Sequence, residues 1–202
     1  MSTPEPGGAP PRAPAVLIRH AQTEWSRDGR HTSRTDVALT DEGRRLARGL
    51  AARLRGWEFE RVLVSPARRA RETCELSGLG ERAELCEDLR EWDYGEDEGL
   101  TTPEILARRP GWELWRDGCP GGESPAAVGL RADRVIAMLD GAGGAAALFS
   151  HGHMLRVLGA RWIELQPGDG RRLGLSTGAV CVLGAERRTP ILARWNDTGE
   201  RG

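Results

Sequence analysis

The sequence contains no lysine, so arginine makes up all 29 of its basic residues. Lysine is therefore excluded as a nucleophile and as a phosphate-binding residue, and an anionic ligand must be bound by arginine or by one of the 4 histidines. Against these stand 30 acidic residues, which leave a net charge of -1. Because the chain has no excess of positive charge, we expect neither nucleic acid nor a membrane surface as a partner.

Cysteine is scarce and long apolar runs are missing. The 4 cysteines are widely spaced: Cys74, Cys86, Cys119 and Cys181. Since they form no Cys-x-x-Cys pair, the sequence encodes neither a zinc site of the usual spacing nor a thioredoxin-like motif. No apolar run is long enough to span a bilayer, and residues 1–14 are rich in proline and glycine without the apolar core of a signal peptide. These features favour a cytoplasmic protein with reduced thiols.

Strand and helix patterns alternate along most of the chain. Residues 1–14 are predicted to be a disordered tail, and residues 15–202 a single domain. The predicted strands are residues 15–18, 61–64, a short one within 81–89, and 145–149, 173–176, 179–183 and 191–195. This alternation indicates an α/β fold.

Helix starts are marked by capping residues. Three helices are predicted to begin after Thr40, Ser65 and Ser124, and a fourth covers Gly152–Trp162. Residues 94–124 differ from the rest, because they are rich in proline and glycine and contain only short helical pieces. We interpret this segment as an excursion that covers the ends of the strands like a lid.

Two of the 4 histidines directly follow an apolar strand. His20 comes after residues 15–18 with Arg19 beside it, and His151 comes after residues 145–149. A lone histidine at a strand end most often only bonds a neighbour, but two in the same place favour a catalytic site. Arginine presents a planar fork that matches phosphate oxygens, and a neutral imidazole can attack phosphorus. The C-terminal edge of the sheet is therefore predicted to bind and attack an anionic group.

Three further residues extend this predicted site. Arg69 lies in the first turn of the helix after strand 61–64, where the amide dipoles favour an anion. The amide of Gly152 starts another helix and is ready to donate to an anion. Glu91 lies among aromatic residues, where partial desolvation favours the protonated form that a general acid needs. Taken alone, Glu91 would be interpreted as a surface acid beside an inward tryptophan, and Asp93 is a competing candidate.

Five segments in the right order resemble the histidine phosphatase superfamily, also called phosphoglycerate mutase-like. They are Arg19-His20-Ala21-Gln22-Thr23-Glu24-Trp25, Thr35-Asp36 to Leu39-Thr40 with Gly43, Ser65-Pro66 with Arg69 and Thr73, Glu91 with Gly95 and Gly99, and Ser150-His151-Gly152 with Arg156. The resemblance implies a three-layer sandwich, in which helices cover both faces of a mixed, mostly parallel central sheet. Two departures are Ala21 and Ser33, which stand where the family usually or often has glycine.

The resemblance also implies roles for individual residues. By position, His20 is the nucleophile that forms a phosphohistidine, and Glu91 is the proton donor. The phosphate pocket comprises Arg19, Arg69 and His151. The substrate side is lined by Ser26, Thr32 and Ser33. Neither a metal nor a cofactor is implied.

The expected function is hydrolysis of small phosphorylated metabolites, namely sugar phosphates or bisphosphates, with a small-molecule phosphate ester as the partner. A second phosphate would need its own site, and the candidates are His31, Arg34, Arg90 and His153. Each of these can equally be solvated or bonded to the backbone.

Two alternatives stay open, a phosphoglycerate mutase and a catalytically inactive binding module of the same fold. The modest length between Glu91 and His151 suggests a more open pocket and favours water over return transfer. An inactive module should have lost a nucleophile or a pocket arginine, yet every position is filled. The oligomeric state is undetermined, with a homodimer as one option.

Overall fold

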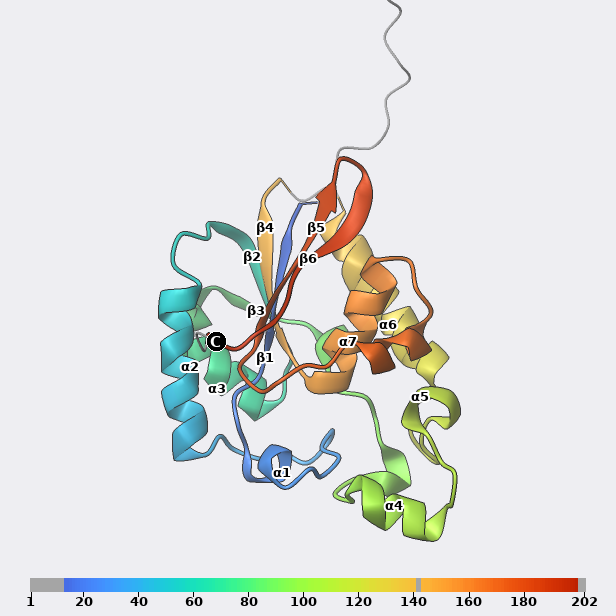
Figure 1. Ribbon diagram of the computed structural model, residues 1–202. Helices are drawn as coiled ribbons and strands as arrows, with labels where there is room; N and C mark the ends of the chain where they lie inside the picture. The colour runs from blue at the N-terminus through green and yellow to red at the C-terminus, as the bar shows by residue number, and fades with distance from the viewer. Residues whose placement is uncertain (1–12, 141–142, 200–202) are drawn as a thin grey trace, which may run out of the picture.

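The computed structural model describes residues 13–140 and 143–199, and a mixed six-stranded sheet lies at its centre (Figure 1). Its strands are β1 (Ala15–Arg19), β2 (Phe59–Val64), β3 (Ala83–Leu85), β4 (Ala145–Ser150), β5 (Val180–Glu186) and β6 (Thr189–Asp197). They are ordered β3-β2-β4-β1-β5-β6. The first four in this order run parallel, whereas β5 is antiparallel to β1, and β6 to β5. The predicted mixed, mostly parallel sheet is confirmed.

Helices cover both faces of this sheet (Figure 1). One face carries α2 (Asp41–Arg53) and α3 (Arg68–Leu76), and the other carries α6 (Pro125–Leu139) and α7 (Gly152–Trp162). Successive side chains of β1 serve the two layers, because Val16 and Ile18 join the core cluster on the side of α2 and α3, whereas Leu17 joins that of α6 and α7. The three-layer sandwich implied by the resemblance is therefore confirmed.

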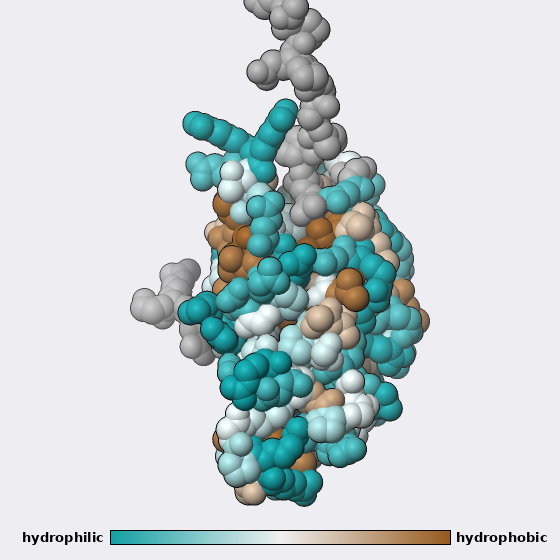
Figure 2. All heavy atoms as spheres, turned by 90° about the vertical axis from the view of Figure 1, so that its right-hand side faces the viewer, coloured by the Kyte–Doolittle hydropathy of each residue, from teal (hydrophilic) through white to brown (hydrophobic). Residues whose placement is uncertain are grey.

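The surface over α6 and α7 is mainly polar (Figure 2). The view onto the side of α6 and α7 shows mainly hydrophilic residues with scattered hydrophobic ones (Figure 2). The remaining helices are short: α1 (Glu24–Arg27), α4 (Thr102–Arg108), α5 (Leu114–Asp117), and the 3-10 helices η1 (Gly80–Arg82), η2 (Glu87–Leu89), η3 (Gly95–Asp97) and η4 (Pro167–Arg172). Within the described ranges, no helix is long and apolar enough to cross a membrane.

Two of the three predicted caps are confirmed, and one is wrong. The Thr40 hydroxyl accepts from the Gly43 amide at the start of α2, and the Ser124 hydroxyl accepts from Ala127 at the start of α6. Ser65 does not cap α3, which begins at Arg68 without a side-chain cap. The Ser65 hydroxyl instead lies 2.7 Å from the His151 ring across the sheet edge and accepts from the Ala67 amide at 3.4 Å, before α3 begins.

The prediction of a strand at residues 173–176 is also wrong. The residues follow η4 as a loop, because their carbonyls bond side chains instead of a neighbouring strand. Trp195 Nε1 donates to the Gly174 carbonyl at 2.7 Å, and Arg19 donates to the Leu175 carbonyl at 2.5 Å.

The segment 94–124 contains η3, α4 and α5. An isolated antiparallel β-bridge between Arg30 and Thr101 connects it to the loop after α1. Its lid function stays a prediction, as does the single domain over 15–202. Of the predicted disordered tail, residues 1–12 lie outside the described residues.

Burial in the central strand predicts a clear contrast in stability. Leu148 in β4 is completely buried, whereas Leu85 in the edge strand β3 is 64% exposed. We expect Leu148→Ala to lower the free energy of unfolding by about 2 to 5 kcal/mol, because it leaves a cavity between packed layers. Leu85→Ala should change it by less than about 0.5 kcal/mol. Urea unfolding of both variants checks this, and equal losses would contradict the assignment of β4 to the core.

Candidate active site

His20 directly follows β1 at the C-terminal edge of the sheet and is 5% exposed. Its backbone amide donates to the Ser150 carbonyl at 2.9 Å, which continues the pairing of β1 with β4. The ring Nδ1 lies 2.8 Å from the Ala21 carbonyl, and since a carbonyl only accepts, Nδ1 carries the proton. Burial lowers the pKa of His20 well below its usual value, and the charges of Arg69 and Arg19 lower it further. The ring is therefore neutral, with the free lone pair on Nε2.

His151 follows β4 in the same way, and its ring centroid lies 5.2 Å from that of His20. Arg69 Nε donates to His151 Nδ1 at 3.2 Å, so the ring proton is on Nε2, which donates to the Ser65 hydroxyl at 2.7 Å. Burial lowers the pKa of His151 well below its usual value, with Arg69 and His20 adding to the effect. His151 is thus neutral, and both of its nitrogens are bonded.

Arg69 brings a fully buried positive charge into the site. Besides His151, its guanidinium donates to the backbone carbonyls of Thr32 at 3.0 Å and Thr35 at 3.2 Å. These partners carry no net charge, so the bonds fix the loop after α1 without neutralising the arginine. Burial is the main influence on Arg69 and lowers its pKa, which the charge of Glu91 opposes.

Arg19 supplies a second cation, half-buried at the end of β1, with an unused donor. Its Nε is buried and has no hydrogen-bond partner among the described residues. A buried donor without a partner is costly, and an anion at this point would satisfy it. Gly152 lets the start of α7 approach this guanidinium, because a Cβ there would lie 3.2 Å from Arg19 Cζ.

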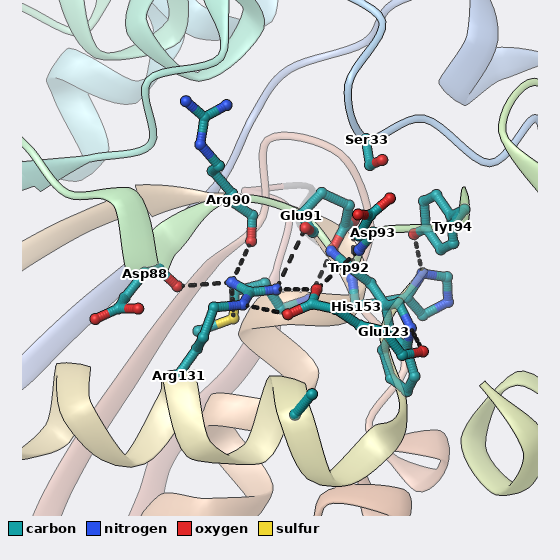
Figure 3. Close-up of polar contacts among 12 residues, drawn as sticks. Ser33, Asp88, Arg90, Glu91, Trp92, Asp93, Tyr94, Glu123, Arg131 and His153 are labelled. Atoms are coloured by element: carbon teal, nitrogen blue, oxygen red, sulfur yellow. Dashed lines mark hydrogen bonds and ion pairs between the residues drawn. The ribbon is translucent and has the colours of Figure 1, made fainter. Parts of the chain in front are cut away.

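Glu91 places its carboxylate at the N-terminus of α7 (Figure 3). Oε1 accepts from the backbone amides of Met154 at 2.8 Å and Trp92 at 2.9 Å, and Oε2 accepts from that of His153 at 3.1 Å. Free helix N-terminal amides and the helix dipole both attract an anionic group. The first turn of α7 therefore holds Glu91 on one side and approaches Arg19 on the other.

A cavity of about 360 Å³ opens between these groups and the segment 94–124. Six of the predicted site residues line it: Arg19, His20, Ser26, Thr32, Glu91 and Gly152. Arg69 and His151 do not line it, and lie behind His20. The rest of the wall contains the aromatic and basic residues Arg30, His31, Tyr94, Trp112, Trp115, His153 and Arg156, together with Gly29, Thr102, Glu113, Leu114 and Leu175. The arrangement can hold an anion at the histidine end and a polar molecule of metabolite size beside it.

A model of the histidine phosphatase superfamily (branch 1) matches residues 15–198. The chain belongs to this superfamily. An acid phosphatase of Mycobacterium tuberculosis is 43% identical, over 91% of this chain and 92% of the relative. A sedoheptulose 1,7-bisphosphatase of Saccharomyces cerevisiae is 36% identical, over 74% and 67%. A 2,3-bisphosphoglycerate-dependent phosphoglycerate mutase of Parvibaculum lavamentivorans is 31% identical, over 83% and 88%. A solved structure from Mycobacterium tuberculosis superimposes with a TM-score of 0.86 at 39% identity, covering 93% of this chain and 99% of the other.

Three of the residues singled out in the sequence lie away from the cavity of this histidine phosphatase. The Ser33 hydroxyl and amide both donate to Glu98, and Ser33 lines a second hollow on the other side of Glu91. Arg34 and Arg90 line the same hollow. The expectation that these three residues face the substrate is therefore not supported by their positions, whereas His31 and His153 do line the cavity.

Arg156 lines the cavity but received no role from the sequence. Its guanidinium lies 4.4 Å from the Trp115 ring centroid and its Nε donates to the Gly170 carbonyl at 3.1 Å. The available signal was its spacing, because a residue four positions after Gly152 lies on the same face of a helix.

The alanine after the nucleophile position is accommodated without strain. Among the described residues other than glycine, only Glu164, Arg187 and Asn196 have a positive φ. Neither Ala21 nor Ser33 therefore occupies a backbone conformation that requires glycine.

Burial lowers the pKa of three histidines well below the usual value, His153 as well as His20 and His151, and this predicts a loss of stability in mild acid. Below pH 6.5 each of these three histidines binds a proton in the unfolded chain but not in the folded protein, so the free energy of unfolding falls as the pH falls. Above pH 6.5 all three rings are neutral in the folded protein and in the unfolded chain, so none of the free energy of unfolding is lost through them. We expect each histidine to add up to about 1.4 kcal/mol per pH unit to the slope below pH 6.5.

Urea unfolding at pH 7.5, 6.5 and 5.5 measures this slope. His151→Asn should reduce this slope by the contribution of one histidine. A free energy of unfolding that is constant across this range would show that these rings are not held neutral.

Proposed function

We propose that this protein is a metal-independent phosphomonoesterase that hydrolyses small phosphate esters through a phosphohistidine on His20. The observation that carries this proposal is the hydrogen bond from His20 Nδ1 to the Ala21 carbonyl. It fixes one tautomer and leaves a neutral Nε2 lone pair on a ring that lines the cavity, beside the unsatisfied Nε of Arg19. A nucleophile and an anion-binding donor therefore share the same end of the cavity.

In the first half-reaction, Nε2 of His20 attacks phosphorus and the bond between phosphorus and the ester oxygen breaks. Glu91, in its protonated form, gives its proton to the departing oxygen, so an alcohol leaves. Arg19 contacts the phosphoryl oxygens, and the charge of Arg69 acts on them from behind His20. His151 holds Arg69 and Ser65 in place.

In the second half-reaction, water attacks phosphorus and the bond to Nε2 breaks, which releases inorganic phosphate and regenerates neutral His20. The Glu91 carboxylate takes one proton from the water and returns to its starting form. Proton and charge balance over the cycle, and the cationic groups need no metal ion to assist them.

Glu91 suits the acid role better than Asp93. The Asp93 carboxylate pairs with Arg34 at 2.5 Å and lines the second hollow, away from His20. Glu91 lines both cavities and is bonded to the first turn of α7.

We place the substrate among small sugar phosphates or bisphosphates, as the sequence suggested. The cavity volume matches a metabolite, and its aromatic rings and basic side chains suit a polyol with further polar groups. The names of the relatives, an acid phosphatase and a sugar bisphosphatase, support this class. Location in the cytoplasm and assembly as a homodimer stay predictions.

Mutase activity is the second candidate, because a phosphoglycerate mutase is among the relatives. A mutase would return the phosphoryl group from His20 to the bound product before water intervenes. Incubation with 3-phosphoglycerate and a trace of 2,3-bisphosphoglycerate separates the two. A mutase converts 3-phosphoglycerate into 2-phosphoglycerate far beyond the amount of bisphosphate added, whereas a phosphatase releases inorganic phosphate instead.

Replacement of His20 tests the covalent step. His20→Asn keeps a donor toward the Ala21 carbonyl but removes Nε2, and we expect kcat/KM to fall by about 10³-fold or more. With a substrate carrying labelled phosphorus, alkaline quenching should trap label on the unmodified protein and none on the variant. Turnover that persists in His20→Asn would rule out this nucleophile. Binding of phosphate esters by the unmodified protein without any turnover would support an inactive module instead.

Replacement of Glu91 tests the proton donor. Glycerol 2-phosphate needs protonation of its leaving oxygen, whereas 4-nitrophenyl phosphate needs little. We expect Glu91→Gln to slow the first substrate about 10²-fold more than the second. Asp93→Asn is the matched control and should slow both substrates to the same small extent. A selective effect in Asp93→Asn, and not in Glu91→Gln, would transfer the role to Asp93.

A further inference from the structure

The segment that carries Glu91 has no strand to hold it. Residues 90–94, which follow η2, have no regular secondary structure, so their backbone groups need other partners. Leu89 is anchored to the sheet, because Ser150 Oγ donates to its carbonyl at 2.7 Å. From Arg90 onward the chain leaves the sheet edge.

One side chain of α6 bonds the start of this segment and the turn before it. Arg131 Nη1 donates to the carbonyls of Asp88 and Arg90, both at 2.8 Å, and Arg131 Nη2 lies 3.3 Å from the Glu91 carbonyl (Figure 3). Nη1 also contacts Met154 Sδ at 3.4 Å, in the first turn of α7. A single guanidinium therefore joins α6, the Glu91 segment and the helix end that binds the Glu91 carboxylate.

Glu123 fixes the plane of this guanidinium. Its Oε1 accepts from Arg131 Nε at 2.8 Å and its Oε2 from Arg131 Nη2 at 2.7 Å, which is the bidentate geometry that orients an arginine. Glu123 Oε2 also accepts from the Asp93 amide at 2.9 Å, and the Glu123 amide donates to the Asp93 carbonyl at 2.9 Å. The pair thus contacts the chain before, at and after Glu91. Side-chain exposures of 12% for Arg131 and 21% for Glu123 show that the contacts are mostly shielded from water.

We infer that Arg131 and Glu123 are positioning residues that hold Glu91 in the geometry in which it protonates the leaving oxygen. Neither residue lines the cavity that contains His20. They contact the main chain around Glu91, whereas backbone amides of α7 bind the Glu91 carboxylate itself. The inference rests on the proposed function, because it gives Arg131 a role only where Glu91 is the proton donor.

The expected effect is selective for the leaving group. A displaced general acid slows the substrate that needs a proton, and small displacements have large effects. We expect Arg131→Met to lower kcat for glycerol 2-phosphate about 10-fold more than for 4-nitrophenyl phosphate, with KM little changed. Arg134→Met is the matched control, because Arg134 lies one turn along α6 and pairs with the Asp88 carboxylate instead of the backbone carbonyls that Arg131 bonds. It should show no selectivity.

Two further variants separate positioning from charge and from folding. Arg131→Lys keeps the charge but cannot form the bidentate pair and reach the carbonyls together, so it should retain the selective loss. Full recovery of the poor substrate in Arg131→Lys would overturn positioning in favour of charge alone. Glu123→Gln is the milder change if Arg131→Met does not fold, and it should show a smaller selective loss in kcat.

A double-mutant cycle decides whether Arg131 acts through Glu91. In a Glu91→Gln background, Arg131→Met should add no further selective loss, because the group that it positions is already gone. Equal slowing of both substrates by Arg131→Met, or the same selective loss in both backgrounds, would overturn the inference while leaving the proposed function intact. Absence of selectivity in Glu91→Gln itself would overturn the acid assignment and this inference together.

Discussion

The site depends on the parallel register of β1 and β4. Ile18 pairs with Phe149 and Arg19 with Ser150, so both strands end at the same level and deliver a histidine to the same edge. The Ser65 amide donates to the Phe149 carbonyl at 2.9 Å, which brings the end of β2 to that level as well. Because each residue advances a strand by about 3.3 Å, a shift of one position would separate the rings, whose centroids lie 5.2 Å apart.

The guanidinium groups of Arg69 and Arg19 are bonded to neutral partners, which do not cancel their positive charge. Arg69 donates to backbone carbonyls and to His151, and Arg19 keeps one donor unsatisfied. A carboxylate bonded directly to either guanidinium would satisfy it more fully, but it would also occupy the place of a phosphoryl group. The nearest acid, Glu91, is bonded instead to backbone amides at the start of α7. The fold thereby keeps an anion site open while its own carboxylate stays close to the reaction.

The features predicted correctly from the sequence are those that depend on residues close together in the chain. The apolar runs of β1, β2 and β4 and the caps at Thr40 and Ser124 were found where they were expected. The cap predicted at Ser65 was wrong, because α3 begins only at Arg68 and the Ser65 hydroxyl bonds a buried imidazole across the edge. Side-chain direction was not predictable either. Arg34 is close to Thr32 in sequence, but only Thr32 faces the cavity, because the chain between them crosses from one side of Glu91 to the other.

The least predictable part of the site is the set of contacts that holds the backbone around Glu91. A segment outside the sheet has backbone carbonyls without strand partners, and the cost of burying them unpaired must be met by donors from elsewhere. Arg131 of α6 donates to these carbonyls, although the sequence predicts nothing more than a helix there. An arginine on the polar side of such a helix is normally solvated, and nothing in its spacing reveals three carbonyls in reach. Under the proposed mechanism, the position of Glu91 as the acid thus depends on packing between α6 and α7, so substitutions far from the cavity would tune proton transfer without changing what the cavity binds.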